Sequence, residues 1–433
     1  MQLLTWKSLP ASARAAALAR PAQAARPETA AAVARIVARV RRDGDAALRR
    51  LTAEFDGVTL RSLRVTPGEV AAAEKALSPA DRSALRVAYR NIRRFHLAQR
   101  PRDVRVETQR GIRCEKLARP IGRVGLYVPG GSAPLFSTAL MLGVPSQLAG
   151  NAVRVLCTPP GRDGRVSPWI LLAARLCGIT DIFKAGGAQA IAAMAYGTGS
   201  VPKCDKLFGP GNAYVTEAKL QVSRDPAGAA IDLPAGPSEV MVLADRSADP
   251  DFVAADLLSQ AEHGADSQVM LVALSAQVAD RVRAALDRQY ALLPRAAIAR
   301  RALEQSRVIL AGSRAEAVAV ANAYAPEHLI LQVEDARALL PGITTAGSVF
   351  LGPWTPESLG DYASGTNHVL PTYGWARACS GLGLADFLRA MTVQTATPRG
   401  LRRLGPVVER LALAENLDAH QRAVRVRLER LRR

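Results

Sequence analysis

The sequence predicts an α/β protein with two mainly parallel sheets. From about residue 120 onward, short apolar runs suited to strands alternate with segments of helical periodicity, a rhythm typical of parallel βα units. A second series of apolar runs opens near residue 238, so the chain contains two such series. Its length of 433 residues accommodates about two to four domains with sizeable cores.

The first series covers residues 124–237. A strand expected at 153–160 is followed by a helix over 167–178, which Ser167 and Pro168 begin and Gly178 ends. Two more strand and helix pairs are expected, at 181–187 with 188–197 and at 206–211 with 212–223. These units together predict one parallel sheet.

The second series predicts a further sheet, with strands at 238–245, 267–274, 307–312, 328–333 and 347–352. We expect earlier sequence, such as residues 63–70, to complete this sheet, which would insert one domain within another. After Cys379 the pattern becomes helical, over residues 382–393 and then in a basic tail from Leu404 to Arg433.

Composition excludes several classes of protein. The hydrophobic content of 49% fits a globular protein, and no apolar run reaches the roughly 20 residues of a membrane span. The Arg-rich N-terminus superficially resembles a transit peptide, but it continues into an amphipathic helix with an apolar side made of Val33, Ile36, Val37 and Val40. We therefore expect folded protein there.

The cysteines and the charge point to a cytoplasmic protein with no nucleic-acid partner. The cysteines form no C-x-x-C pair and are odd in number, so we expect buried small hydrophobes in a reducing compartment, at Cys114, Cys157, Cys177, Cys204 and Cys379. The net charge of +19 comes largely from Arg residues spread along the whole chain, without a recognised DNA-reading motif.

A metal-capable pair occurs at the end of an expected helix. Asp249 and Pro250 begin this helix, an apolar stripe runs along it, and Gly264 ends it. Gln260 and His263 share one face in the last turn, where the partial negative charge of a helix end favours a cation. The alternative is a C-terminal histidine that hydrogen-bonds the last free carbonyls.

Other candidate groups lie where elements begin or end. Glu327 and His328 stand where a helix ends before Pro326 and a strand begins, and they could supply two bases of different pKa, or could belong to a surface loop. Asp361 and His368 bracket a stretch rich in Gly, Ser and Thr that we expect to be an ordered loop. A carboxylate and an imidazole suit zinc, but this spacing matches no local metal motif.

Glycine-rich turns at residues 128–132, 184–189 and 208–212 adjoin strand ends or helix starts. Each could offer backbone N–H groups to phosphates. None is a G-x-G-x-x-G fingerprint, so a dinucleotide is permitted but not indicated by these turns.

Eight segments, taken in chain order, closely resemble the histidinol dehydrogenase family. They are VGLYVPGGSAPLFST, GGAQAIAAMAYGT, FGPGNAYVTEAK, DLPAGPSEVMVLAD, LLSQAEHGADSQ, YAPEHLI, GSVFLG and GDYASGTNHVLPTYG. Residues 41–57, RRDGDAALRRLTAEFDG, match as well, so the resemblance covers almost the whole chain.

The resemblance implies an NAD-dependent, zinc-containing enzyme that oxidises L-histidinol through L-histidinaldehyde to L-histidine, the last steps of histidine biosynthesis. It implies that His328 is the general base and that Glu327 activates water for the second oxidation. One Zn²⁺ per subunit would be bound by Gln260, His263 and Asp361, with His420 from the other subunit of a homodimer.

Further contacts follow from the same resemblance. Substrate contacts are implied for Ser238, Gln260, His263, His328, Asp361, Glu415 and His420. NAD contacts are implied for Tyr127, Gln189 and Asn212. His368 is expected near the pocket, without an assigned role.

The implied fold has two incomplete Rossmann-like domains with small helical N- and C-terminal domains. The expected helical segments are 1–26, which packs with the C-terminal part, and 379–433, which reaches the partner's site. Residues 27–123 and 238–378 would form a discontinuous α/β domain on the metal and substrate side, and 124–237 the NAD side.

Two other classes of function remain open at this point. A zinc hydrolase would use Glu327 and His328 to activate water on an amide or ester. A non-catalytic, Arg-rich nucleic-acid binder would show strongly salt-dependent DNA retention.

Overall fold

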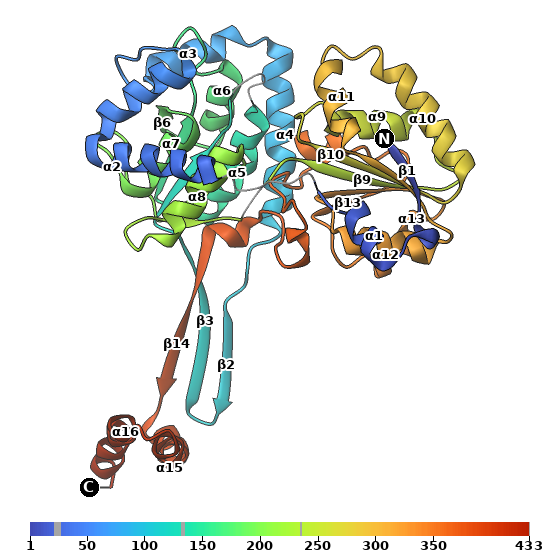
Figure 1. Ribbon diagram of the computed structural model, residues 1–433. Helices are drawn as coiled ribbons and strands as arrows, with labels where there is room; N and C mark the ends of the chain where they lie inside the picture. Colours follow the sequence, from blue (N-terminus) through green and yellow to red (C-terminus); the bar gives the residue numbers. More distant parts are fainter. Residues whose placement is uncertain (21–26, 131–134, 234–235, 433) are drawn as a thin grey trace.

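The computed structural model describes residues 1–20, 27–130, 135–233 and 236–432. It consists of two α/β halves side by side and a long arm that carries a pair of helices at its tip (Figure 1). Each half is built on a parallel sheet, as expected for an α/β protein. Within the described ranges, no helix is both long and apolar enough to cross a membrane.

The first half contains a five-stranded parallel sheet with the order β6-β5-β4-β7-β8. Because the chain reverses direction across the sheet between β4 and β7, a crevice is expected at the carboxyl ends of these two strands. The strands are β4 (Arg123–Tyr127), β5 (Val153–Thr158), β6 (Asp181–Lys184), β7 (Lys206–Phe208) and β8 (Ala230–Ile231). The helices between them are α5 (Phe136–Ala149), α6 (Pro168–Leu176), α7 (Gly187–Tyr196) and α8 (Ala213–Arg224).

The second half contains a six-stranded parallel sheet with the order β1-β11-β10-β9-β12-β13. From β9 onward its strand order repeats that of the first half, with the reversal between β9 and β12. The strands are β1 (Gln2–Thr5), β9 (Glu239–Ala244), β10 (Gln268–Ala273), β11 (Arg307–Leu310), β12 (His328–Gln332) and β13 (Ser348–Leu351). The helices are α9 (Pro250–Ala261), α10 (Ala276–Tyr290), α11 (Ala296–Glu304), α12 (Arg314–Tyr324) and α13 (Ala336–Leu339).

Short elements complete this half. They are η1 (Trp6–Ser8) and α1 (Ala11–Ala17) after β1, η2 (Leu340–Gly342) before β13, and α14 (Glu357–Tyr362) and η3 (Trp375–Arg377) after it. The helix α14 shows that the expected loop beginning near Asp361 is in part helical, because residues 360–362 form its last turn.

Two expectations, a wholly helical N-terminal segment and a strand at residues 63–70 in the second sheet, are wrong. Residues 1–20 are not purely helical, because β1 pairs in parallel with β11 as an edge strand. Residues 63–70 do not complete the six-stranded sheet, since Arg64 bridges to Phe183 beside the other sheet. A strand of four residues is too short to show a period, and a hydrophobic pattern does not specify its partner strand. Residues 21–26 and 131–132 of the expected segments lie outside the described residues.

The expected domain boundary at residue 123 is also corrected. The helices α2 (Pro27–Asp56), α3 (Pro67–Ala76) and α4 (Pro79–Leu97) pack on the five-stranded half. Val33 and Leu48 of α2 share a core with Ile191 of α7, and Ile92 of α4 shares one with Leu140 of α5. The apolar faces of the three helices were readable from the sequence, but not the sheet that they cover.

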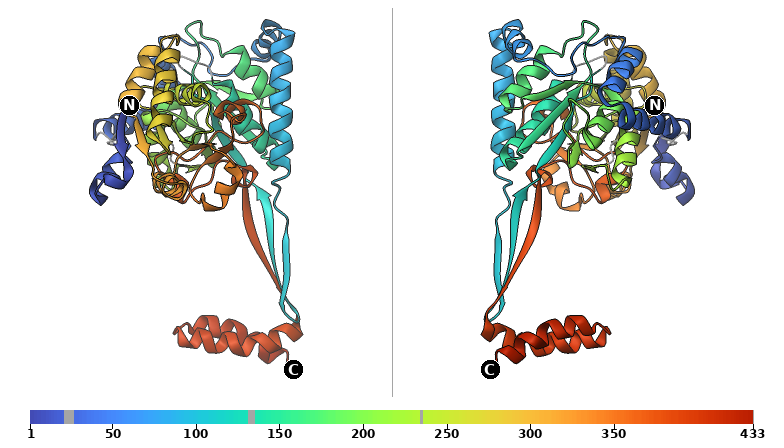
Figure 2. Two further views of the ribbon diagram at one scale, coloured as in Figure 1. Left: turned by 90° about the vertical axis from the view of Figure 1, so that its right-hand side faces the viewer. Right: turned by 90° about the vertical axis from the view of Figure 1, so that its left-hand side faces the viewer.

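The arm is a three-stranded antiparallel sheet with the order β14-β3-β2 (Figure 2). Its strands are β2 (Val104–Gln109), β3 (Ile112–Pro120) and β14 (Leu388–Ala396), and its tip carries α15 (Pro398–Ala414) and α16 (Asp418–Arg430). The expected helix at 382–393 is therefore wrong: only η4 (Leu384–Phe387) is helical there. Pairing with β3 supplies hydrogen bonds that decide the conformation of a segment with mixed propensity.

A buried ion pair holds the turn that follows β7. Lys219 pairs with Asp232, and both side chains are almost fully buried. Lys219 also donates to the Gly209 carbonyl at 2.9 Å, while the Gly209 N–H donates to Asp232 at 2.8 Å. Gly209 has a φ of 125°, and a Cβ there would lie 2.2 Å from the Tyr127 carbonyl oxygen. The pair thus fixes a turn that only glycine can make.

We predict that Lys219→Met lowers the free energy of unfolding by about 3 to 5 kcal/mol, because it leaves the Asp232 carboxylate buried without its cation. Urea titration measures this loss. The matched control is Arg300→Met, which removes the exposed Arg300–Glu304 pair and should cost at most roughly 0.5 kcal/mol. Equal losses in the two variants would contradict the role given to the buried pair.

Candidate active site

A cavity of about 110 Å³ lies at the seam between the halves. From the second half, at the amino ends of β9 and β12, it is lined by Ser238, Gln260, His263, Glu327, His328, Asp361 and His368. From the first half, Leu135 and Ser137 after β4 and Pro210 after β7 contribute. The structure thus brings together all the predicted catalytic, metal and substrate residues that precede residue 379, and it places His368 beside them as expected.

Gln260, in the last turn of α9, and His263, two residues beyond the end of the helix, both line this cavity, so α9 ends earlier than the expected stop at Gly264. Asp249 caps the helix by accepting from the Asp251 N–H at 2.8 Å, and the apolar stripe packs into the core of the second half. The Gln260 amide lies against Glu357 and Glu239. In the orientation that satisfies both neighbours, its nitrogen donates to the Glu357 carboxylate and its oxygen accepts from the Glu239 N–H at 3.2 Å.

A possible cation site forms where α9 meets α14. One ligand atom each from His263, Glu357 and Asp361 lies within 4.8 Å of the other two. Glu357 was not among the residues expected from the sequence. Its spacing of four residues from Asp361 is the signal that could have revealed it, because residues i and i+4 share one face of a helix.

Burial and neighbouring charges shift the pKa values of all three residues at this site. Burial raises the pKa of Glu357 to about 8, an effect that His328 opposes and Asp361 reinforces. Burial also lowers the pKa of His263. Part of this side chain remains exposed to solvent. Burial raises the pKa of Asp361, but His328, His368 and His263 together outweigh burial and lower it. Two carboxylates and an imidazole in this setting suit a divalent cation.

The Glu327 and His328 side chains are held by the backbone of β9. Glu327 accepts from the Glu239 N–H at 2.9 Å, and the His328 Nδ1 lies 3.2 Å from the Glu239 carbonyl oxygen. The buried His328 Nε2 lies 3.5 Å from Asp361 Oδ1 and has no hydrogen-bond partner among the described residues. With Nδ1 donating to the carbonyl, Nε2 is the nitrogen left free to exchange a proton.

Neighbouring carboxylates strongly shift the pKa of the His328 imidazole. Burial lowers its pKa, but the adjacent Glu327 and Glu357 carboxylates outweigh burial and raise it well above the usual range. A cation bound among the carboxylates would reduce this effect.

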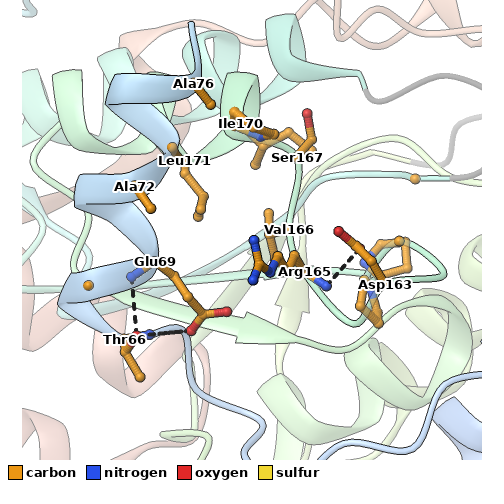
Figure 3. A pocket seen from close by; sticks show the side chains of 17 residues that line it. Thr66, Glu69, Ala72, Ala76, Asp163, Arg165, Val166, Ser167, Ile170 and Leu171 are labelled. Atoms are coloured by element: carbon orange, nitrogen blue, oxygen red, sulfur yellow. Dashed lines mark hydrogen bonds between the residues drawn. The ribbon is translucent and has the colours of Figure 1, made fainter.

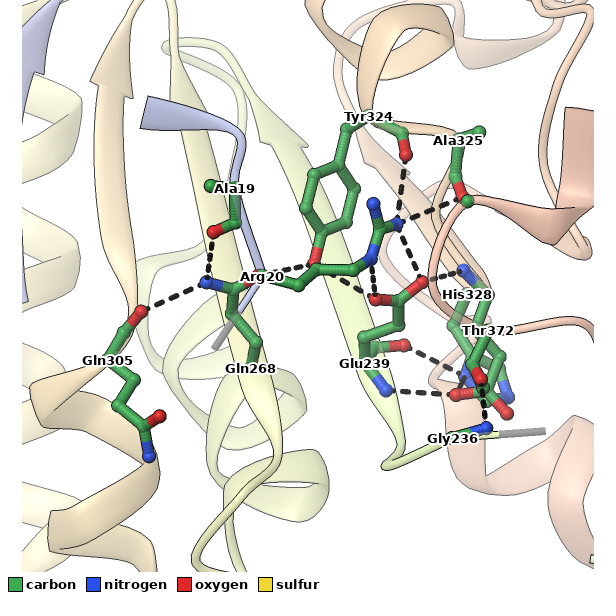
Figure 4. Close-up of polar contacts among 12 residues, drawn as sticks. Ala19, Arg20, Gly236, Glu239, Gln268, Gln305, Tyr324, Ala325, His328 and Thr372 are labelled. Carbon is green, nitrogen blue, oxygen red and sulfur yellow. Dashed lines mark hydrogen bonds and ion pairs between the residues drawn. The ribbon is translucent and has the colours of Figure 1, made fainter. Parts of the chain in front are cut away.

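Glu239 connects this pair to the N-terminal segment (Figure 4). The Arg20 guanidinium forms a bidentate, buried ion pair with Glu239, with distances of 2.5 and 2.8 Å. Arg20 also donates to the Tyr324 carbonyl at 2.9 Å, just before Ala325, whose φ of 53° is in the left-handed region. Neither Arg20 nor Glu239 was singled out from the sequence.

The predicted NAD residues line a separate cavity of about 530 Å³ at the carboxyl ends of β4 and β5. Tyr127 is buried, and its hydroxyl accepts from the Gly187 N–H at 3.0 Å. Burial raises the pKa of Tyr127 to about 12. Gln189 lies in the first turn of α7, and Asn212 caps α8 by accepting from the Tyr214 and Val215 N–H groups. The three residues, though far apart in sequence, therefore meet at the crevice that the strand order predicts.

A larger cavity of about 790 Å³ shares Gly130 and Pro159 with this one. Figure 3 shows the larger cavity from close by. It lies between α3 and the segment that leads into α6, with Glu69 and Asp163 among its polar residues. Of the residues predicted from the sequence to act in catalysis or binding, only Gly130, in one of the glycine-rich turns, lines it.

Glu415 and His420 do not join the site within one chain. Both are exposed and lie at the tip of the arm, far from the seam between the halves (Figures 1 and 2). Within one subunit, these two residues therefore cannot contact a metal or a substrate in the small cavity.

No cysteine is among the described residues that line the small cavity. Cys157, Cys177 and Cys204 are buried, as expected for small hydrophobes, and burial raises the pKa of each thiol. A thiol with a raised pKa is a poor source of thiolate. Cys114 and Cys379 are only partly buried, so the expectation of burial is wrong for these two.

Comparison with known proteins identifies the family. A sequence model described as histidinol dehydrogenase matches residues 18–428. The histidinol dehydrogenase of Vibrio parahaemolyticus is 57% identical over 431 residues, which cover 100% of this chain and 99% of the relative. The chain belongs to the histidinol dehydrogenase family. It is therefore an enzyme.

Other members of the histidinol dehydrogenase family support the same assignment. The protein of that name from Xanthomonas euvesicatoria is 58% identical over 428 residues, covering 99% of each chain. The crystal structure of histidinol dehydrogenase from Elizabethkingia anophelis superposes with a TM-score of 0.96 at 47% identity, covering 100% of this chain and 99% of that one. The fold described above, with its arm, is thus the fold of a histidinol dehydrogenase.

The stability of this enzyme should depend on pH through Asp256 of α9. This carboxyl accepts from Gln332 at 3.3 Å, and burial raises its pKa to about 6. An unfolded aspartic acid has a pKa of about 3.9, so between these values the folded chain binds the extra proton. The wild type therefore loses stability as the pH rises through this window, by at most about 3 kcal/mol.

We predict that Asp256→Asn raises the free energy of unfolding above pH 7 and that this gain shrinks as the pH falls toward 4. Urea titrations across that range measure the difference from the wild type. Asp280→Asn, on the exposed face of α10, is the control and should show no such trend. A gain for Asp256→Asn that is constant with pH would contradict burial as the cause.

Proposed function

We propose that this enzyme oxidises L-histidinol through L-histidinaldehyde to L-histidine, with NAD as the hydride acceptor, in the last steps of histidine biosynthesis. The observation that carries the proposal is the meeting of Glu327 and His328 with a cation-compatible cluster in one cavity, in a chain of this family. We place the activity in the cytoplasm, in keeping with cysteines that are all free thiols.

We propose one Zn²⁺ per subunit, held by Gln260, His263, Asp361 and the partner's copy of His420. The cluster of His263, Glu357 and Asp361 is the local support for a cation. Gln260 would have to turn its amide, since its oxygen faces the Glu239 N–H. Bound there, the metal would orient and polarise the substrate. Glu357, which accepts from the Gln260 nitrogen, is placed to steer that amide.

In the proposed mechanism, His328 takes the hydroxyl proton of histidinol while hydride leaves the same carbon. Its Nε2 is buried, lacks a partner among the described residues, and lies in the cavity wall. Hydrogen bonding of Nδ1 to the Glu239 carbonyl fixes the ring so that Nε2 is presented to the substrate. A general base needs this kind of positioning before its pKa matters.

Glu327 acts in the second oxidation. We propose that it takes a proton from the water that adds to the aldehyde, which creates the hydrate from which the second hydride leaves. Its carboxylate is buried and anchored by the Glu239 N–H, within 3.5 Å of His328. Two bases in one small cavity allow both oxidations without release of the aldehyde. Ser238 lies in the same wall and would contact the substrate.

Two NAD molecules in turn would occupy the cavity lined by Tyr127, Gln189 and Asn212, and each would accept one hydride. The cavity's volume of about 530 Å³ falls in the usual range for a small-molecule site. The turns after β4 and β7 contribute to both cavities, through Gly130 and Asn212 on one side and Leu135 and Pro210 on the other. A dinucleotide lying across these turns would reach the substrate.

We propose a homodimer in which the arm of one chain completes the site of the other. The tip helices leave apolar side chains exposed, among them Val407, Leu411, Leu413 and Val426. Exposed apolar faces of this extent mark contact surfaces. Glu415 and His420 lie on the same tip, so a partner chain would be the means of bringing them to the substrate and the metal.

We predict that each histidinol consumed yields two NADH. Both oxidations occur at one site, so no free aldehyde should accumulate. NADH absorbance and chromatographic histidine, measured at completion, give the ratio. A ratio of one with aldehyde in solution would contradict the two-step proposal, and a zinc hydrolase would produce no NADH.

The same NADH assay tests whether activity requires the metal. Protein stripped of metal by a chelator should lose turnover and regain it on addition of Zn²⁺, because the substrate is no longer oriented. Full activity in metal-free protein would contradict the proposed role of the cation.

We predict that two inactive variants, His263→Ala and His420→Ala, restore activity when co-expressed. A mixed dimer contains one site with both defects and one with neither. Random pairing makes half of the dimers mixed, so roughly a quarter of wild-type activity is expected. Purified mixed dimers that are as inactive as either parent would show that His420 serves its own chain.

A further inference from the structure

Asp56 lines the proposed cofactor cavity, and one of its carboxylate oxygens has no hydrogen-bond partner among the described residues. It is the last residue of α2 and lines the cavity beside Phe55, Tyr127 and Gln189. Its Oδ2 is buried and has no hydrogen-bond partner among the described residues. Burial raises the pKa of Asp56. An acceptor removed from water without a donor costs free energy, so the arrangement suits a ligand that brings donors.

The surroundings of Asp56 indicate which part of a ligand it meets. Ile36 and the half-exposed Phe55 give the adjoining wall an apolar, aromatic surface. Such a surface suits the face of a purine ring. A ribose attached to that ring carries vicinal hydroxyls, which are the neutral donors that a carboxylate accepts in pairs.

The charges in the cavity decide between two cofactors. Asp56 repels a 2′-phosphate, whereas Arg162, which also lines the cavity and is exposed, attracts one. Because Asp56 Oδ2 is buried, its field is less screened than that of an exposed Arg162. The carboxylate therefore prevails close to the ribose.

We infer that Asp56 binds the adenosine ribose hydroxyls of the dinucleotide and makes the enzyme select NAD over NADP. This inference rests on the proposed function, since it assumes that the cavity takes a dinucleotide. It adds a specificity residue that lies on α2, outside the βα units that supply Tyr127, Gln189 and Asn212. In the usual Rossmann arrangement, an acidic residue within the βαβ unit makes the equivalent contact.

The test compares the dissociation constants of NAD⁺ and NADP⁺, measured by calorimetry on the purified full-length enzyme. Asp56→Asn should weaken NAD⁺ by roughly ten- to hundredfold, as expected for loss of a hydrogen bond to a charged group. The same variant should bind NADP⁺ more tightly than the wild type, because Arg162 then acts unopposed. An unchanged ratio of the two constants would overturn the inference.

Glu54→Gln is the matched control. It removes the same charge from the last turns of α2, but Glu54 pairs with Arg39 at the surface and does not line the cavity. Both dissociation constants should stay within about twofold of the wild type, since surface charges interact weakly. A change as large as that of Asp56→Asn would mean that helix charge, not ribose contact, sets the preference, and would overturn the inference.

A measurement on the wild-type enzyme covers the case in which Asp56→Asn does not fold. AMP should compete with NAD⁺ more strongly than 2′-deoxy-AMP does, because the deoxy compound lacks one donor to Asp56. Equal competition would overturn the inference while leaving the proposed function intact. Failure of the wild type to bind either dinucleotide would instead remove the proposed use of NAD, and the inference with it.

Discussion

The buried ion pair between Arg20 and Glu239 is the constraint on which the proposed catalytic pair, Glu327 and His328, depends. Glu239 uses its side chain to hold Arg20, its N–H to hold Glu327 and its carbonyl to hold His328. Desolvating two charges costs several kcal/mol, so the value of this pair lies in geometry. Through it, hydrogen bonds join the N-terminal segment, β9 and the turn before β12.

The position of the site follows from the opposition of two similar sheets. Both halves have a reversal of strand order, between β4 and β7 in one and between β9 and β12 in the other. The carboxyl edge of the first reversal faces the amino edge of the second, and the small cavity lies between them. On the proposed function, the dinucleotide would use the crevice of one sheet, while the other sheet would supply the bases and the cation ligands.

On the proposed dimer, the arm explains why one chain would be chemically incomplete. Its strands carry α15 and α16 away from the body, and the tip helices expose apolar side chains that a folded protein normally covers. A second chain that covers them would at the same time receive Glu415 and His420. On the proposed dimer, assembly and catalysis therefore depend on the same contact.

The sequence by itself determined the local structure and much of the chemistry. Caps and apolar stripes predicted α9, the strand starting at His328 and the alternation of βα units, because these signals act within a few residues. The motifs identified the family and the cavity residues from Ser238 to His368. Glu357 could have been found by its spacing from Asp361. Arg20, Glu239 and Asp56 could not, since nothing near them in sequence reveals their partners.

Only the tertiary structure decided which sheet each element joins and which distant residues meet. β1 pairs with β11 across about 300 residues, α2 to α4 cover the first half, and residues 388–396 form a strand because β3 lies beside them. A hydrophobic pattern states that a face must be buried, not what buries it. Pairing and packing are settled by the free energy of the whole chain, and a segment of intermediate propensity takes the conformation that its neighbours make available.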